Sequence, residues 1–228
     1  MIIILIVFML IGFYVQWRLK SKFKEYSKVP IASGMSGAEV AQQMLNDFGI
    51  SSVSIQSVPG KLTDHYNPAD KTVNLSPEVY NGRSVSAAAV AAHECGHAVQ
   101  HATGYKWLQM RSQLVPIVSI SGKVINFIFL AMIFGMFLFN LFTFDFVLIT
   151  LIVAQGAITA FTLVTLPVEY DASNRALAWL KTTGVTGPAE QEKAEDALKW
   201  AARTYLVAAL AAVTQLLYYI MLFMGSRD

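Results

Sequence analysis

Long apolar stretches separated by polar segments dominate the pattern along this chain of 228 residues. Residues 1–17 are almost wholly apolar, and further apolar runs lie at residues 115–142, 144–166 and 204–224. At the α-helical rise of 1.5 Å per residue, about 20 apolar residues cross the hydrocarbon core of a bilayer. The pattern therefore predicts about four transmembrane helices.

Between these runs, the polar segments divide the chain further. The first apolar run is expected to be an uncleaved anchor, because it has neither a basic segment before it nor an Ala-x-Ala-like cleavage site. In the second run, the spanning part is expected at about residues 124–142, followed by a tight hairpin connection at residues 140–145. The predicted segments are an anchor (1–17), a catalytic portion (18–115), a transmembrane hairpin (116–166), a polar segment with two helices (167–203) and a last span (204–225).

The polar segment before the second apolar run has the local signals of a small folded unit. Ser36 and Glu39 form a capping box that predicts a helix beginning near Gly37. Alternation at residues 52–58 and the run at residues 72–75 predict two strands. Ser84 and Gly104 bracket an Ala-rich helix expected from about Val85 to Ala102. The predicted fold is thus mainly α and integral to a membrane, with a small sheet of two or three strands.

Composition and charge narrow the functional classes. Apolar residues make up 55% of the chain and charged residues 14%, which is typical of an integral membrane protein. The net charge of +2 and the lack of a basic patch interleaved with aromatic residues exclude a nucleic-acid partner. The single cysteine, Cys95, excludes an internal disulfide.

The Ala-rich helix carries a His-Glu-x-x-His motif. Residues four apart lie on one face of a helix, so His93 and His97 can bind the same metal ion. Glu94 is rotated by one position and can reach a metal-bound water without being a ligand. The spacing predicts a zinc hydrolase with two ligands and a general base on one helix.

A catalytic zinc ion usually has a third protein ligand. The best candidate is Glu169, at the start of a helical-looking run after the third apolar stretch, and Asp171 is its rival. Glu169 could instead simply stabilise the amino end of a helix. His101, on the same stripe as His97, is expected to support the site or lie on the surface.

The distribution of basic residues predicts the topology of the membrane spans. Lys and Arg cluster at residues 18–28 and 175–203, and none lies between Lys123 and Arg175. The positive-inside rule places residues 18–115 and 168–203 in the cytoplasm. The two histidines and Glu169 then share one face of the membrane, as a single metal site requires. We expect a multi-pass plasma-membrane protein with a cytoplasmic active site.

Several motifs resemble a known family. Ala91–Gln100 around the histidines, residues 167–177 around Glu169 and the segments at residues 64–68 and 73–80 are similar to the YugP-type neutral zinc metallopeptidases of membranes. The likeness extends more distantly to the membrane zincins that process prenylated proteins or act in heat-shock quality control, which are gluzincins. The resemblance implies one Zn²⁺ per chain on His93, His97 and Glu169, with Glu94 as catalytic base. Ser173 stands where the distant relatives carry an aspartate.

The expected reaction is peptide-bond hydrolysis by a zinc-bound water that Glu94 activates. The substrate is expected to be a peptide or a membrane protein, and membrane lipid is an expected partner, whereas a homo-oligomer or a membrane-protein partner is left open. His65, Tyr170 and Arg175 are candidates to stabilise the oxyanion.

Two other functions compete with this hypothesis. A catalytically idle membrane scaffold could retain a structural zinc, which a fourth ligand such as His101 or Cys95 would close. A protease that cuts within the bilayer would place the motif in a long apolar span, whereas polar residues bracket residues 84–103. A hydrolase acting on a bond other than a peptide bond could use the same metal site.

Overall fold

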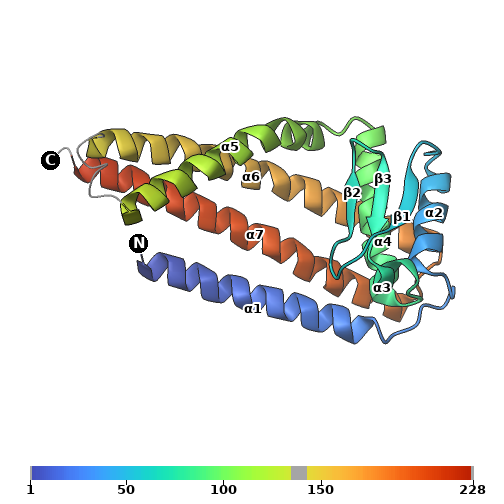
Figure 1. Cartoon of the computed structure of the whole chain (residues 1–228). Helices are drawn as coiled ribbons and strands as arrows, with labels where there is room; N and C mark the ends of the chain where they lie inside the picture. Colours follow the sequence, from blue (N-terminus) through green and yellow to red (C-terminus); the bar gives the residue numbers. More distant parts are fainter. Residues whose placement is uncertain (1, 135–142, 227–228) are drawn as a thin grey trace.

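The computed structural model describes residues 2–134 and 143–226. Within these residues, four long helices extend in one direction from a smaller portion that holds a sheet (Figure 1). The helices and strands are α1 (Ile2–Tyr26), α2 (Gly37–Asp47), β1 (Ser54–Ser57), β2 (His65–Asn67), β3 (Thr72–Leu75), α3 (Pro77–Tyr80), α4 (Val85–Ala102), α5 (Lys106–Phe134), α6 (Phe144–Thr182) and α7 (Pro188–Gly225).

The predicted fold class is confirmed. Four helices, α1, α5, α6 and α7, are long and apolar enough to cross a membrane. Of these, α6 is the most enclosed, with α5 and α7 packed beside it, whereas few residues in the apolar parts of α1 and α5 are buried. Such exposure of apolar side chains fits a lipid environment.

The second span begins earlier than expected. The prediction placed its start near residue 124, but α5 begins at Lys106 and continues through Pro116. Lys123 lies inside this helix and is exposed. A charged residue is tolerated there because the long lysine side chain can carry its charge away from an apolar surface. The rest of the predicted span and part of the hairpin connection fall on residues 135–142, outside the described residues.

The later helices run without a break from apolar into polar sequence. α6 spans 39 residues and passes through Pro167, so Glu169 belongs to the same helix as the third span. α7 spans 38 residues and joins the predicted charged helix to the last span. The loop predicted at about residues 182–188 lies between them.

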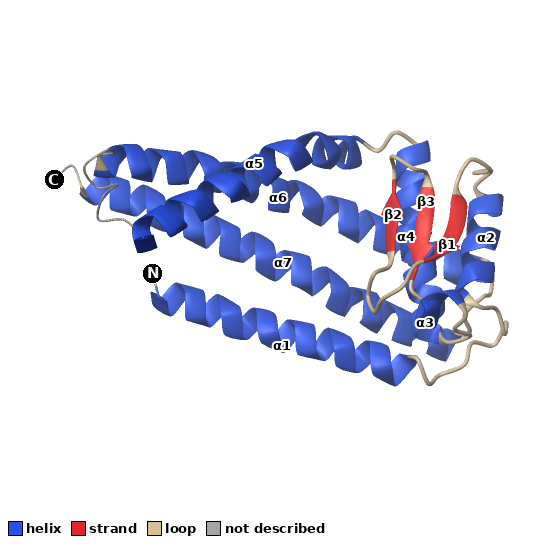
Figure 2. Cartoon of the chain, viewed as in Figure 1, coloured by secondary structure: helices blue, strands red, loops and turns tan. Residues whose placement is uncertain are grey.

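The sheet has the strand order β1-β3-β2, with β1 parallel and β2 antiparallel to β3 (Figure 2). The first and last strands were predicted, although β1 is shorter than expected. β2 was not predicted, because its three residues are too few to show an alternating pattern. In its pairing with β3, Tyr66 lies opposite Val73, and β2 forms an edge of the sheet.

Local signals set the helices of the smaller portion. Ser36 and Glu39 form the predicted capping box of α2, and Gly49 follows that helix with a φ of 67°, a conformation that favours glycine. Ser84 caps α4 by accepting a hydrogen bond from the Ala87 amide. α4 begins and ends at the predicted residues, and most of its side chains are buried.

The helix α4, which carries the His-Glu-x-x-His motif, packs very closely on α6. A Cβ added at Gly96 would lie 2.6 Å from the carbonyl oxygen of Ala172, a separation that real side chains do not adopt. Gly96 therefore allows the backbones of the two helices to approach. This approach brings the middle of α4, with its two motif histidines, against the turn of α6 that carries Glu169.

The two ends of the four-helix portion differ. The start of α1 and the end of α7 lie together at the end remote from α4 and the sheet (Figure 1). The segments predicted to lie on one side of the membrane are therefore gathered at one end of the molecule. That the end with α4 and the sheet faces the cytoplasm remains a prediction.

Candidate metal centre

Three side chains that were expected to bind a metal lie together. The Nε2 atom of His93 is 3.3 Å from Oε2 of Glu169, and Nε2 of His97 is 3.6 Å from the same oxygen. The two imidazole rings come from adjacent turns of α4, with centroids 4.8 Å apart, and the carboxylate comes from α6. One ligand atom from each side chain lies within 4.8 Å of the others.

The donor set fits a zinc ion. The Oε2 atom of Glu169 is buried and has no hydrogen-bond partner within the described residues. Only 2% of the side chain is exposed, so bulk water does not supply that partner. A buried carboxylate oxygen normally has a partner, so an unpartnered one facing two imidazole nitrogens indicates a bound cation. Two imidazoles and one carboxylate are the ligands of many catalytic zinc sites.

A buried glutamine fixes the protonation of His97. The side-chain amide of Gln100 donates from Nε2 to the Val168 carbonyl at 2.7 Å and to Oδ2 of Asp171 at 2.8 Å. Its Oε1 atom must therefore accept, and it lies 3.0 Å from Nδ1 of His97. The proton of neutral His97 is thus on Nδ1, and the lone pair of Nε2 faces Glu169.

The charges around His97 also act on its proton affinity. Burial lowers the pKa of this imidazole, but the carboxylates of Glu169 and Glu94 and the Gln100 hydrogen bond outweigh burial and raise the pKa. Without a cation, the pocket therefore favours a proton on His97. A metal ion that takes the same position must displace that proton.

The serine that replaces the expected aspartate has a direct contact. The hydroxyl of Ser173 lies 3.1 Å from Nδ1 of His93, so it occupies the orienting position without a charge. Asp171, the rival third ligand, binds Gln100 and the Nε atom of Arg175 at 2.6 Å instead. Asp171 therefore supports His97 through Gln100 and does not face the cluster.

Two contacts to Glu169 escaped the sequence analysis. Nη1 of Arg111, from the second turn of α5, lies 3.2 Å from Oε1 of Glu169. Tyr205, from α7, lies near the same carboxylate and near Glu94. A signal for Arg111 was available, because it is the one charged residue between Lys106 and Lys123 and an isolated charge beside a membrane span often marks a functional site. We find no comparable signal for Tyr205.

The motif glutamate is held by the edge strand. Oε2 of Glu94 accepts a hydrogen bond from the Tyr66 amide at 2.9 Å, and the residue is almost fully buried. The Tyr66 hydroxyl in turn lies 2.7 Å from Nδ1 of His101. β2 thus fixes the carboxylate of Glu94, and His101 supports the strand that does so.

The other residues proposed for the site have different partners. His65 contacts the Thr63 carbonyl and Asn74, Arg175 binds Asp171, and Tyr170 is 43% exposed. Within the described residues, no hydrogen bond or ion pair joins these three oxyanion candidates to the two histidines, Glu94 or Glu169. The thiol of Cys95 points to the Ala41 carbonyl, and burial raises its pKa.

Comparisons with known proteins agree with this chemistry. The chain matches the family described as "Putative neutral zinc metallopeptidase" over residues 1–224. It is 39% identical to the "Putative membrane protease YugP" of Bacillus subtilis (strain 168) over 218 residues, which is 96% of this chain and 94% of that protein. No solved structure is significantly similar to this chain. With a match over nearly its whole length, this membrane protein belongs to that family of neutral zinc metallopeptidases.

Proposed function

We propose that this chain is a membrane-bound zinc metalloendopeptidase that hydrolyses peptide bonds at the cytoplasmic face of the plasma membrane. His93, His97 and Glu169 are the zinc ligands, with one ion per chain, and Glu94 is the general base. The observation that carries the proposal is the buried, unpartnered Oε2 of Glu169 facing Nε2 of both histidines. The family and the relative from Bacillus subtilis support the reaction type.

When bound, zinc supplies Lewis acidity, which makes a water molecule acidic near neutral pH and polarises the substrate carbonyl. Glu94 accepts the proton of the attacking water and later passes it to the leaving amine. The amide of Tyr66 holds one oxygen of Glu94 at 2.9 Å, which leaves Oε1 to carry the proton. Gln100 and Ser173 orient the two imidazoles.

Tyr205 is the best-placed donor for the developing oxyanion. Its side chain lies near both Glu169 and Glu94, on the α7 side of the candidate metal centre. The phenol is neutral and can donate one hydrogen bond at the moment when negative charge develops on the carbonyl oxygen.

The idle scaffold is the alternative, and the contacts disfavour it. A structural zinc site is closed by a fourth protein ligand. Within the described residues, the candidate metal cluster contains three residues, because Cys95 is turned toward Ala41 and His101 toward Tyr66. Three protein ligands leave a position for water and substrate, as a catalytic site requires.

The deciding experiment compares the wild type with Glu94→Gln, which keeps the shape of the side chain and removes its basicity. We expect both proteins to bind one zinc per chain, measured by elemental analysis, and only the wild type to cleave an unfolded test protein or a membrane-anchored peptide. Glu169→Ala should lose both zinc and cleavage. Cleavage that survives Glu94→Gln would refute the role of Glu94, and zinc retained at full occupancy in Glu169→Ala would refute the third ligand.

A further inference from the structure

A cluster of arginine and tryptophan side chains joins α1 to α7, away from the metal centre. The guanidinium carbon of Arg18, from α1, lies 5.2 Å from the ring centroid of Trp200 on α7. The guanidinium carbon of Arg203 lies 4.1 Å from the same centroid. Tyr14 packs edge-on against Trp200 at 6.2 Å. Two cations therefore share one aromatic ring, each attracted by its π-electrons.

The charges of these two arginines are not neutralised by the protein. Within the described residues, no hydrogen bond or ion pair involves either guanidinium, and Nε of Arg18 is buried without a partner. Asp196 attracts Arg203, but its carboxylate is already bound by the Tyr26 hydroxyl at 2.6 Å and the Lys22 ammonium at 3.2 Å. An anion beside the two guanidinium groups would offset their positive charge.

The position of the cluster along both helices indicates which anion is available. Arg18 directly follows the apolar run of α1, and Arg203 directly precedes the apolar part of α7. Tryptophan and arginine at such boundaries lie at the level of the lipid head groups. The abundant anion at that level is the phosphate of a phospholipid.

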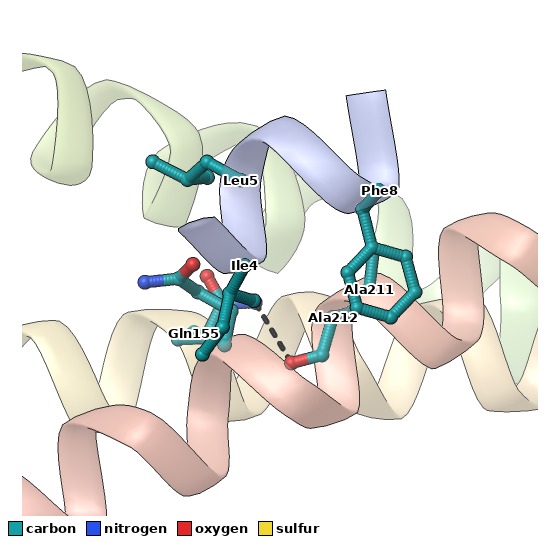
Figure 3. Close-up of a pocket in the computed structure, with 7 residues that line it drawn as sticks. Ile4, Leu5, Phe8, Gln155, Ala211 and Ala212 are labelled. Carbon is teal, nitrogen blue, oxygen red and sulfur yellow. Dashed lines mark hydrogen bonds between the residues drawn. The ribbon is translucent and has the colours of Figure 1, made fainter. Parts of the chain in front are cut away.

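The same helices also line a pocket deeper in the membrane. It has a volume of about 230 Å³ and lies between α1, α6 and α7 (Figure 3). Its lining is mostly apolar and consists of Ile4, Leu5, Phe8, Gln155, Ala211, Ala212 and Gln215. The amide of Gln155 donates to the Ala212 carbonyl at 3.2 Å, so this polar group is already partnered (Figure 3).

The separation between the arginines and the pocket matches the depth of one lipid leaflet. Phe8 precedes Arg18 by ten residues on α1, which is about 15 Å along a helix. Half of the hydrocarbon core of a bilayer is also about 15 Å. A lipid with its phosphate between Arg18 and Arg203 could therefore place the end of an acyl chain in the pocket.

We propose that Arg18, Trp200 and Arg203 form a binding site for the head group of an anionic phospholipid, with one acyl chain reaching the pocket between α1, α6 and α7. Guanidinium groups bind phosphate oxygens through paired hydrogen bonds. A net negative lipid fits better than a zwitterionic one, because the choline cation of phosphatidylcholine would compete with the arginines for the phosphate. The lipid would fasten α1, which is one of the two least enclosed spans, to α7.

The test measures lipid binding on the full chain. It uses the Glu94→Gln variant, so that the result does not depend on proteolysis. Native mass spectrometry of the purified protein in neutral detergent gives dissociation constants for phosphatidylglycerol and phosphatidylcholine. The double variant Arg18→Gln/Arg203→Gln removes the proposed site. Lys20→Gln/Lys24→Gln is the matched control, because it removes two exposed cations from the same stretch of α1 that do not touch Trp200.

We expect the arginine double variant to bind phosphatidylglycerol roughly 30-fold more weakly, since it loses both of the proposed direct, charge-assisted contacts to the phosphate. The lysine control should stay within about threefold of the wild type, because exposed charges are screened. Equal weakening in both double variants, or equal affinity of the wild type for the two lipids, would overturn the site. If the arginine double variant does not fold, Arg203→Gln alone, at an exposed position, serves instead.

Two further arms separate the head group from the acyl chain. Ala211→Leu should fill the pocket and weaken binding of phosphatidylglycerol with long acyl chains but not of a six-carbon analogue that cannot reach it. Equal effects on both lipids would overturn the assignment of the pocket. Thermal stabilisation by inorganic phosphate as large as that by the lipid would overturn the lipid as ligand.

Discussion

Removing the arginine that contacts the third ligand should weaken zinc binding. Arg111 reaches Oε1 of Glu169 at 3.2 Å, while Oε2 faces the two histidines. The carboxylate is thus held from one side and left open on the other, which fixes the oxygen that we propose to bind the metal. Arg111→Ala would let the carboxylate rotate and would leave a buried charge with one partner fewer.

The geometry sets the scale of the effect. Two unit charges 3.2 Å apart attract by about 5 kcal/mol at an effective dielectric constant of about 20. Water competes for Arg111, whose side chain is 31% exposed, so only part of this attraction is lost on mutation. Outer-shell mutations commonly weaken metal binding by about 10–100-fold, and we expect Arg111→Ala to fall in that range.

Competition with a zinc-binding dye, followed for the wild type and the variant, measures the affinity. Arg111→Lys should recover part of it, since lysine keeps the charge but not the planar fork. Lys106→Ala is the control, because it removes an exposed cation five residues earlier on α5. Unchanged or tighter zinc binding by Arg111→Ala would refute the reasoning, because repulsion between Arg111 and the metal would then outweigh orientation of Glu169.

Three further outcomes are expected. Gly96→Ala places a methyl group 2.6 Å from the Ala172 carbonyl oxygen. Thermal unfolding should show that the free energy of unfolding falls by about 1–3 kcal/mol, and zinc binding should weaken. A stable variant with normal zinc affinity would contradict the close helix contact. Tyr205→Phe should keep zinc but lower kcat by about 10²–10³-fold in a peptide-cleavage assay, whereas unchanged kcat would exclude Tyr205 as the oxyanion donor. Because the pKa of His97 is raised, a proton should compete with zinc for this imidazole as the pH drops through that pKa. Zinc affinity measured between pH 8 and pH 5 should therefore fall with falling pH. A flat profile would contradict this competition.

The parts of the structure that the sequence predicts well depend on local chemistry. Ser84 and the Ala-rich run define α4 to the residue, because capping and helix propensity involve only neighbouring positions. Ser36 does the same for α2. The four spans follow from apolar length, which is a property of the segment alone.

The third ligand was predicted from its place after the third apolar run and from the family resemblance, and a global constraint supported the prediction. The distribution of basic residues places Glu169 on the same side of the membrane as the two histidines. The choice between Glu169 and Asp171 was harder, because both are carboxylates on one helical turn. The structure separates them by their partners, since Gln100 and Arg175 occupy Asp171.

The contacts that sequence reasoning missed join distant segments. Arg111, Tyr205 and Gln100 act on ligands that lie far along the chain or on another helix, and no spacing rule connects them. The short strand β2 was missed for a related reason, because its pairing with β3 and its contact with Glu94 define it more than its three residues do. Partners of this kind depend on tertiary packing.

The arrangement of these partners shows that the membrane spans belong to the metal centre itself. The two histidines come from α4 in the smaller portion, but Glu169 comes from α6, Arg111 from α5 and Tyr205 from α7. Each of those three helices is long and apolar enough to cross a membrane. If the spans served only as an anchor, the smaller portion would hold a complete site when separated from them. It holds two of the three candidate ligands, so a movement of α6 against α4 must also change the position of Glu169 relative to His93 and His97.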